Sequence, residues 1–254
     1  MIPIRDDNPQ ILTPYATYTI IALNAIVWVF VQGFGAPGQL VSSICSFGLI
    51  PAQLLQSGLV MPLGASQCVI GDSGWYTTIT SMFMHGGWMH LIGNMWFLWI
   101  FGDNVEDAMG TRRFVIFYVL CGLAAAALQV FSNPDSIVPM VGASGAIGGV
   151  MGAYIVLFPR VHVHMLVFFG YFVTRFAVPA VFMLGYWLVV QFLSGVLATG
   201  GQGGGVAFWA HVGGFVAGMA LIFLFRDKKL LAQHPYHGLR QTRSPTRNWR
   251  RIDR

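Results

Sequence analysis

Six long apolar stretches place the strongest constraint on what this chain can fold into. A transmembrane helix needs about 20 mostly apolar residues. Charged residues make up only 9% of the chain, whereas about 25% is usual in soluble proteins. So few charges cannot cover a water-facing surface, which excludes the soluble globular classes and predicts an all-α polytopic membrane protein. The six predicted spans are 15–34, 83–102, 114–131, 141–158, 177–197 and 206–225.

The spans divide the chain into a short N-terminus (1–14), a six-helix domain (15–226) and a basic tail (227–254) that we expect to be disordered. The first residues, MIPIRDDNPQ, lack a basic segment that leads into a cleavable apolar core, so no signal peptide is expected. The long first loop (35–82) is uncharged and apolar around FGLIPAQLLQSGLV, which predicts short helices in the outer interface. The apolar segment 163–173 is too short to span and predicts an interfacial or re-entrant piece.

The positive charges alternate along this arrangement. Arginine precedes span one and lies between spans two and three and between spans four and five, while both Lys and Arg follow span six. The other three connections, 35–82, 132–140 and 198–205, contain neither residue type. The positive-inside rule therefore predicts that both termini are cytoplasmic, as in a multi-pass protein of a bacterial cytoplasmic membrane. The basic tail is expected to lie against anionic lipid headgroups, and no nucleic-acid partner is expected.

The cysteines predict no metal site, since Cys45, Cys68 and Cys121 fit no metal-binding spacing. Cys45 and Cys68 share the first loop, where they form either a disulfide or two separate thiols.

Polar side chains gather at one depth of the predicted bundle. Spans two, four and six run in the same direction, and their outer ends carry His90 and Asn94, Ser144, and His211, respectively. At 1.5 Å rise per residue, all four side chains lie roughly 5–15 Å below the outer surface. Polar groups in hydrocarbon are costly, so they are expected to face one another or a water-filled cavity. His85 lies just above them, at the mouth of its helix.

Small residues surround two of these polar groups. Gly145 and Gly148 follow Ser144. Gly214 and Gly218, which lie four residues apart, follow His211. Two such faces pack closely, which would bring the serine hydroxyl and the imidazole into hydrogen-bonding range. This arrangement predicts a nucleophile, a base and two side-chain donors for an oxyanion.

A third member of a catalytic triad is not evident. Asp103, Glu106 and Asp107 lie on the order of 15–20 Å below His90, whereas Asp72 and Asp135 in outer loops are not excluded by distance. A two-residue Ser–His pair is favoured. The alternative interpretation of a serine in a GASG sequence is helix packing without catalysis.

The motifs that carry these residues resemble those of the rhomboid intramembrane serine proteases. HGGWMHLIGN (85–94) has the His-x4-His-x3-Asn pattern of that family, GASG (142–145) is similar to its nucleophile motif, and AHVGG (210–214) to its base motif. FGDNVEDAMG (101–110) is similar to the turn that follows its second helix. The resemblance covers about residues 40–226.

The resemblance implies a six-helix rhomboid-like bundle that cleaves single-span or multi-span membrane proteins in or next to their transmembrane segments, without metal or cofactor. It implies Ser144 as nucleophile and His211 as general base. It implies an oxyanion hole formed by His90, Asn94 and the Ser144 backbone N–H. The residues expected to support this site are His85, Gly142, Gly145 and Gly148. The fifth helix (177–197) and the loop at 198–205 correspond to the lateral gate and cap.

Two departures from the family pattern change what is expected. The first loop reads WYTTIT (75–80) where many relatives have Trp-Arg, so its bracing is in question. Gly148 replaces an aromatic residue that stacks on the base in many relatives. His211 is therefore held by another group, or the pocket beneath Ser144 is more open.

Two other classes of function fit parts of the sequence. One is an inactive rhomboid-like protein that binds membrane proteins, although such proteins usually lack the serine or the histidine that this chain retains. The other is a transporter with His90 and His211 as a proton relay. The chain shows no obvious inverted repeat and no deep carboxylate, which argues against a transporter.

Overall fold

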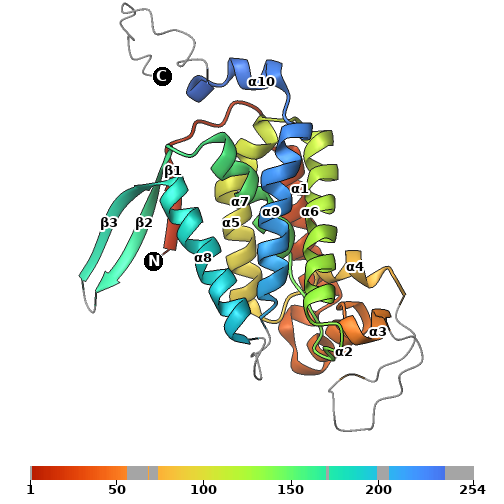
Figure 1. Cartoon of the computed structure of the whole chain (residues 1–254). Helices are drawn as coiled ribbons and strands as arrows, with labels where there is room; N and C mark the ends of the chain where they lie inside the picture. The colour runs from red at the N-terminus through yellow and green to blue at the C-terminus, as the bar shows by residue number, and fades with distance from the viewer. Residues whose placement is uncertain (1, 56–67, 69–73, 170–171, 199–205, 238–254) are drawn as a thin grey trace, which may run out of the picture.

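The computed structural model describes residues 2–55, 68, 74–169, 172–198 and 206–237. Within these residues, six long helices form a bundle, and a three-stranded sheet lies along one side of it (Figure 1). The bundle helices are α1 (Tyr15–Phe30), α5 (Trp88–Asp107), α6 (Thr111–Ser132), α7 (Ser144–Leu157), α8 (Ala180–Ala198) and α9 (Phe208–Phe225).

Each predicted span coincides with one of these helices, although the ends are shifted by a few residues. By length and composition, α6, α8 and α9 are long and apolar enough to cross a membrane. The helices α1 and α7 are apolar but shorter. The mainly helical bundle is therefore confirmed, while the number of six spans stays a prediction.

The helix α7 is buried inside the bundle, and residues 145–154 are all buried. It packs against α9 with backbone in direct contact. A Cβ atom added to Gly214 would lie 1.9 Å from the carbonyl oxygen of Gly145, and one added to Gly218 would lie 1.9 Å from that of Gly149. Only glycine fits at such a contact. The expected close packing of the two glycine-containing faces is therefore present.

The sheet corrects the prediction of an all-α fold. Its strands are antiparallel in the order β1-β2-β3, with β1 at Ile2–Asp6, β2 at His162–Phe169 and β3 at Phe172–Pro179. The segment expected to be an interfacial or re-entrant piece, 163–173, contains most of β2 and the first two residues of β3. Its first strand buries Val163, Met165 and Val167 while the residues between them are more exposed. This alternation with period two is typical of a strand with one covered face.

The strand β1 is anchored to the bundle by polar contacts. The indole Nε1 of Trp96 on α5 donates a hydrogen bond to the carbonyl oxygen of Pro3 over 2.6 Å. The hydroxyl of Tyr154 on α7 donates to the Asp6 carboxyl group. Burial raises the pKa of the Asp6 carboxyl to about 6. The N-terminal residues therefore form part of the fold.

The long first loop contains short helices, as predicted. In the described residues these are η1 (Gly33–Gly35), α2 (Pro37–Phe47), α3 (Pro51–Leu55), α4 (Thr77–Thr80) and η2 (Ser81–Phe83). Residues 56–67 and 69–73 of this loop lie outside the described residues.

Two cross-links brace this loop. Cys45 and Cys68 form a disulfide, one of the two alternatives that the sequence left open. Leu49 and Met140 exchange two backbone hydrogen bonds of 3.0 and 2.7 Å, which tie the loop to the segment that leads into α7. The loop is thus held by a disulfide at one point and by backbone hydrogen bonds at another.

The tail that follows α9 begins with an ordered turn where the sequence analysis expected disorder. The helix α10 spans Lys228–Gln233, and the Asp227 carboxylate accepts hydrogen bonds from the backbone N–H groups of Lys229 and Leu230. This side-chain cap explains why a helix starts there. Residues 238–254 lie outside the described residues.

Glu106, at the end of α5, caps the N-terminus of α1. Its buried carboxylate accepts the backbone N–H groups of Ala16 and Thr17 at 3.0 and 2.9 Å. It also accepts the hydroxyls of Thr17 and Thr111 at 2.9 and 2.7 Å. The first N–H groups of a helix have no partner within the helix, and the helix dipole favours an anion beside them. Glu106 thus has a structural role, joining α1 to α5 and α6.

We expect Glu106→Ala to lower the free energy of unfolding by about 3 kcal/mol, since it leaves buried donors without their charged acceptor. Glu106→Gln keeps one acceptor oxygen and should cost about half as much. Equilibrium unfolding in detergent micelles, followed by circular dichroism, measures both values. Equal stability of Glu106→Ala and the unaltered protein would contradict the proposed role.

Candidate active site

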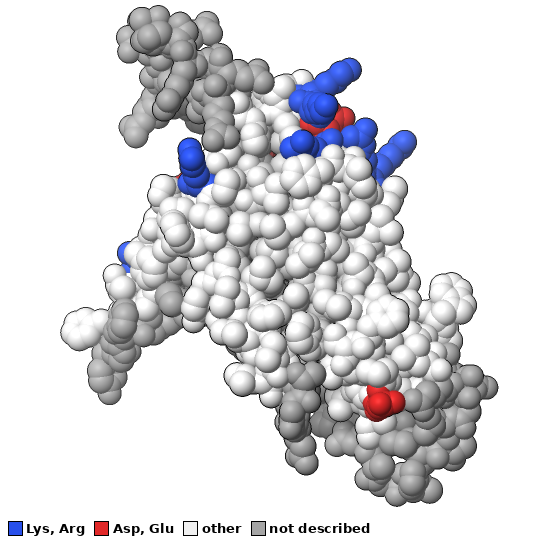
Figure 2. Space-filling model, in the orientation of Figure 1, with Lys and Arg blue, Asp and Glu red and all other residues white. Residues whose placement is uncertain are grey.

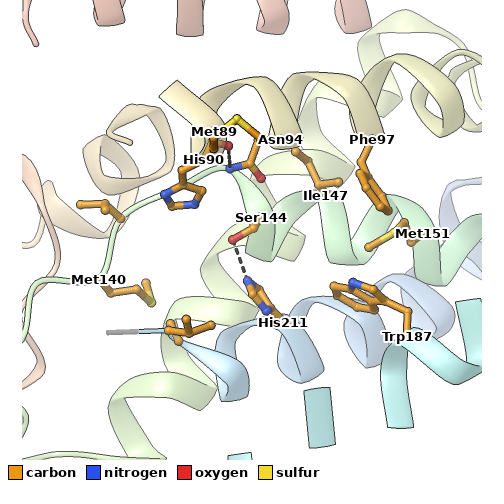
Figure 3. Close-up of a pocket in the computed structure, with 14 residues that line it drawn as sticks. Met89, His90, Asn94, Phe97, Met140, Ser144, Ile147, Met151, Trp187 and His211 are labelled. Carbon is orange, nitrogen blue, oxygen red and sulfur yellow. Dashed lines mark hydrogen bonds between the residues drawn. The ribbon is translucent and has the colours of Figure 1, made fainter. Parts of the chain in front are cut away.

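A cavity of about 370 Å³ opens between α5, α7, α8 and α9. Most of its wall is apolar, and a few polar side chains converge within it (Figure 3). Such a combination is typical of ligand and substrate sites. The residues that line it include Met89, His90, Asn94, Phe97, Ser144, Ile147, Met151, Trp187 and His211.

Ser144 and His211 meet in this cavity. Ser144 is the first residue of α7, and His211 lies in the first turn of α9. The serine Oγ and the histidine Nε2 are 2.8 Å apart, within hydrogen-bonding distance (Figure 3). The structure therefore brings together the two side chains that were predicted to be nucleophile and base. In chemical terms, a hydroxyl that donates to a neutral imidazole is poised to lose its proton when it attacks an electrophile.

Glycines allow the neighbouring helices to approach Ser144. A Cβ atom on Gly145 would lie 2.6 Å from the Cβ atom of Ala125 on α6, and one on Gly148 would lie 3.0 Å from the carbonyl oxygen of His211. Gly148 thus faces the backbone of α9. The cavity wall below Ser144 is formed instead by Ile147 and Met151. The absence of an aromatic residue at 148 therefore lets α9 come close and leaves the wall to these two side chains.

Gly142 precedes the nucleophile in a conformation that favours glycine, with φ at +123°. A Cβ atom at this position would also lie 2.7 Å from the Nε2 atom of His90. The backbone turn that leads into α7 therefore passes directly beside the imidazole of His90, and a side chain would separate the two.

His90 and Asn94 lie on the cavity wall, in the first two turns of α5. The Nδ1 atom of His90 accepts the backbone N–H of Gly86 at 3.2 Å. In a neutral imidazole this leaves the proton on Nε2, which lies beside Gly142. The amide of Asn94 donates one N–H to the His90 carbonyl oxygen at 2.9 Å and retains a second N–H. Both side chains thus carry an N–H donor and line the same cavity as Ser144.

His85 lies behind His90 and does not line the cavity. Its side chain is fully buried, and its ring packs edge-on against the ring of His90 with centroids 5.2 Å apart. The side-chain amide of Gln32 makes two hydrogen bonds with the backbone of His85, at 2.8 and 2.9 Å. His85 is therefore placed to support the position of His90 from behind, and it adds no polar group to the cavity.

Two residues that contact His211 were missed by the sequence analysis, and both lie on α8. The Oε1 atom of Gln191 is 2.7 Å from Nδ1 of His211. The indole ring of Trp187 lies at 40° to the imidazole with centroids 5.7 Å apart. These contacts answer the question of what holds His211 in place of an aromatic residue at 148. A glutamine in an otherwise apolar predicted span is unusual, and this signal could have identified Gln191.

The described part of the chain contains no group of three or more His, Cys, Asp or Glu side chains placed to hold a metal ion. The polar side chains of the cavity are one hydroxyl, two imidazoles and one amide, a set suited to acyl-transfer chemistry.

Comparison with known proteins gives relatives in bacteria and plants. The chain is 29% identical over 155 residues to the putative rhomboid protease YdcA of Bacillus subtilis, covering 60% of this chain and 68% of YdcA. It is 27% identical over 210 residues to the rhomboid protease GluP of the same organism, covering 82% of this chain and 35% of GluP. It is 31% identical over 158 residues to the mitochondrial RHOMBOID-like protein 6 of Arabidopsis thaliana, covering 56% of this chain and half of that protein.

The chain therefore spans about half, or less, of the length of several of its relatives. The family profile described as the Rhomboid domain matches residues 72–228, more than half of the chain and the part that holds all four polar cavity residues. The chain belongs to the rhomboid family.

Proposed function

We propose that this protein is an intramembrane serine endopeptidase with Ser144 as nucleophile and His211 as general base. The observation that supports this most is the 2.8 Å contact between the serine hydroxyl and the imidazole, inside a cavity between apolar helices. Its substrates would be single-span or multi-span membrane proteins, cleaved in or next to their transmembrane segments.

The reaction follows from the two groups. His211 Nε2 takes the Ser144 proton as Oγ attacks the scissile carbonyl carbon, and a tetrahedral oxyanion forms. His211 then gives the proton to the leaving amine, the C–N bond breaks, and an acyl-enzyme remains. Water, activated by the same imidazole, hydrolyses the ester and restores the serine. A helical substrate must first unwind, because its amides are hydrogen-bonded within the helix.

Three donors near Ser144 would stabilise the oxyanion. They are the Nε2–H of His90, the free amide N–H of Asn94 and the backbone N–H of Ser144, which lies at the N-terminus of α7. The first N–H groups of a helix lack partners within the helix and lie at the positive end of its dipole. These donors are held in place before reaction, so they cost little reorganisation in the transition state.

We expect Asn94→Ala to lower kcat by about 100- to 1000-fold, the usual effect of removing one oxyanion donor. The variant should stay folded, because the Asn94 amide bonds only to a carbonyl of its own helix in this structure. Steady-state cleavage of a single-span substrate in detergent gives kcat, and thermal unfolding gives the control. A loss of activity that merely follows unfolding would refute the assignment.

The membrane arrangement that we propose has six spans and both termini on the cytoplasmic side of a bacterial membrane. Figure 2 shows Lys and Arg side chains gathered at the end of the molecule where α10 lies, as the positive-inside rule requires of a cytoplasmic face. The disulfide between Cys45 and Cys68 lies in the first loop, toward the opposite end (Figure 1). Disulfides persist in oxidising compartments, which supports an extracytoplasmic position for this loop.

Substrates would reach the cavity from the side of α8. Of the three candidate spans, α8 has the smallest share of buried residues, 17% against 44% for α6 and 39% for α9. The loop that we expect to act as a cap, 198–205, lies outside the described residues except for Ala198.

The experiment that tests the proposal combines purified protein in detergent with a single-span substrate in H₂¹⁸O. One new peptide N-terminus, with ¹⁸O in the carboxylate of the other fragment, is the expected result. An inactive rhomboid-like binding protein would retain the substrate without forming these fragments. Proton-coupled uptake into proteoliposomes, unaffected by Ser144→Ala, would instead favour a transporter.

A further inference from the structure

We infer that Gln191 on α8 is a positioning residue for the base, so that the Ser–His pair works as a chain of three groups, Ser144, His211 and Gln191. This inference rests on the proposed protease function and deepens it. The sequence of contacts is continuous: Ser144 Oγ lies 2.8 Å from His211 Nε2, and His211 Nδ1 lies 2.7 Å from Gln191 Oε1.

The chemistry of the amide oxygen determines which ring nitrogen is protonated. A neutral imidazole carries one N–H donor and one acceptor nitrogen, whereas an amide oxygen only accepts. The contact between Nδ1 and Oε1 therefore requires the proton on Nδ1. This leaves the lone pair of Nε2 directed at the serine hydroxyl, which is the form that a general base needs.

The same hydrogen bond strengthens as the reaction proceeds. When His211 takes the serine proton, the imidazole becomes cationic and its Nδ1–H bond to Gln191 becomes a charge-assisted one, which is stronger than a neutral one. Gln191 would thus lower the energy of the charged state without touching the substrate. A carboxylate has this task in a Ser-His-Asp triad, whereas here the Nδ1 atom of His211 contacts an amide oxygen.

Two different residues of α8 orient the His211 imidazole and pack against its ring. Trp187, one turn earlier on α8, packs against the imidazole with the two rings tilted at 40°, while Gln191 Oε1 lies 2.7 Å from its Nδ1 atom. Removing the amide therefore leaves the ring supported by Trp187. The expected defect is in proton transfer, and substrate binding should be preserved.

The test compares Gln191→Met, which keeps the chain length and loses the acceptor, with Gln191→Glu, which keeps an acceptor oxygen. We expect Gln191→Met to lower kcat by about 10- to 100-fold, as for the loss of a hydrogen bond to a charged group, with KM within threefold. Gln191→Glu should keep at least a third of the original kcat. The matched control is Leu193→Met on the exposed side of the same helix, which should leave kcat within twofold.

A second measurement uses a small covalent inhibitor in place of the peptide substrate. The rate at which a small fluorophosphonate labels Ser144 should fall in Gln191→Met and recover in Gln191→Glu. Equal losses in the two variants, or a change confined to KM, would overturn the inference, as would unchanged kinetics of Gln191→Met. These outcomes leave the protease proposal intact, whereas that proposal fails if the unaltered protein neither cleaves the substrate nor becomes labelled.

Discussion

Replacing Ser144 with alanine should lower kcat/KM for a single-span membrane substrate by at least about 10⁴-fold, because it removes the one hydroxyl among the described residues that line the cavity. Without the nucleophile no oxyanion forms, so the remaining donors have no charge to stabilise. Cleavage of a fluorescent substrate in proteoliposomes measures the loss, and quantitative mass spectrometry of the fragments extends its range.

The protein should stay folded in this experiment. The hydroxyl contributes one hydrogen bond, worth about 1 kcal/mol, and α7 is held by its buried face. Ser43→Ala, at a buried serine in α2 of the first loop, is the matched control and should cleave at the original rate. Equal activity of Ser144→Ala and Ser43→Ala would remove Ser144 from the mechanism.

Replacing Gly214 with alanine should lower kcat by at least about 100-fold and reduce stability as well. The added methyl carbon would lie 1.9 Å from the Gly145 carbonyl oxygen, so α7 and α9 must move apart. Ser144 and His211 stand on these two helices, and a displacement of about 1 Å commonly costs on the order of 10²-fold in rate. Parallel measurements of kcat and thermal unfolding in the same detergent test both parts.

Gly185→Ala is the control for this prediction. Gly185 lies on α8, and a Cβ atom there has no neighbour within 4 Å. Alanine is up to about 1 kcal/mol better than glycine within a helix, so this variant should be as stable as the unaltered protein or slightly more so. Unchanged activity and stability of Gly214→Ala would show that the close approach of α7 and α9 is not required.

The helical bundle could be predicted from the sequence because a run of about 20 apolar residues has few other stable forms in a membrane. The sheet could not be predicted in the same way. Val163, Met165 and Val167 alternate with more exposed neighbours, but Leu166 and the aromatic residues that follow make the segment apolar throughout. Length and composition alone do not separate such a strand from an interfacial helix.

The pairing of Ser144 with His211 could be predicted because depth along a helix follows directly from residue number. The rotation of a helix about its own axis does not follow from residue number. Whether Gln191 faces lipid or the imidazole depends on how α8 is turned by the sheet and by α9, and this is set by tertiary packing. For the same reason, His85 could be placed near His90 along the chain, while its position behind the cavity wall could not.

The central claim is that the Ser144 hydroxyl is activated by His211. The most direct measurement is covalent labelling of the purified protein with a fluorophosphonate, followed by peptide mapping. We predict a single adduct on Ser144 that forms in the unaltered protein and is lost, or slowed by orders of magnitude, in His211→Ala. Labelling that is absent from Ser144, or equally fast without His211, would contradict the account.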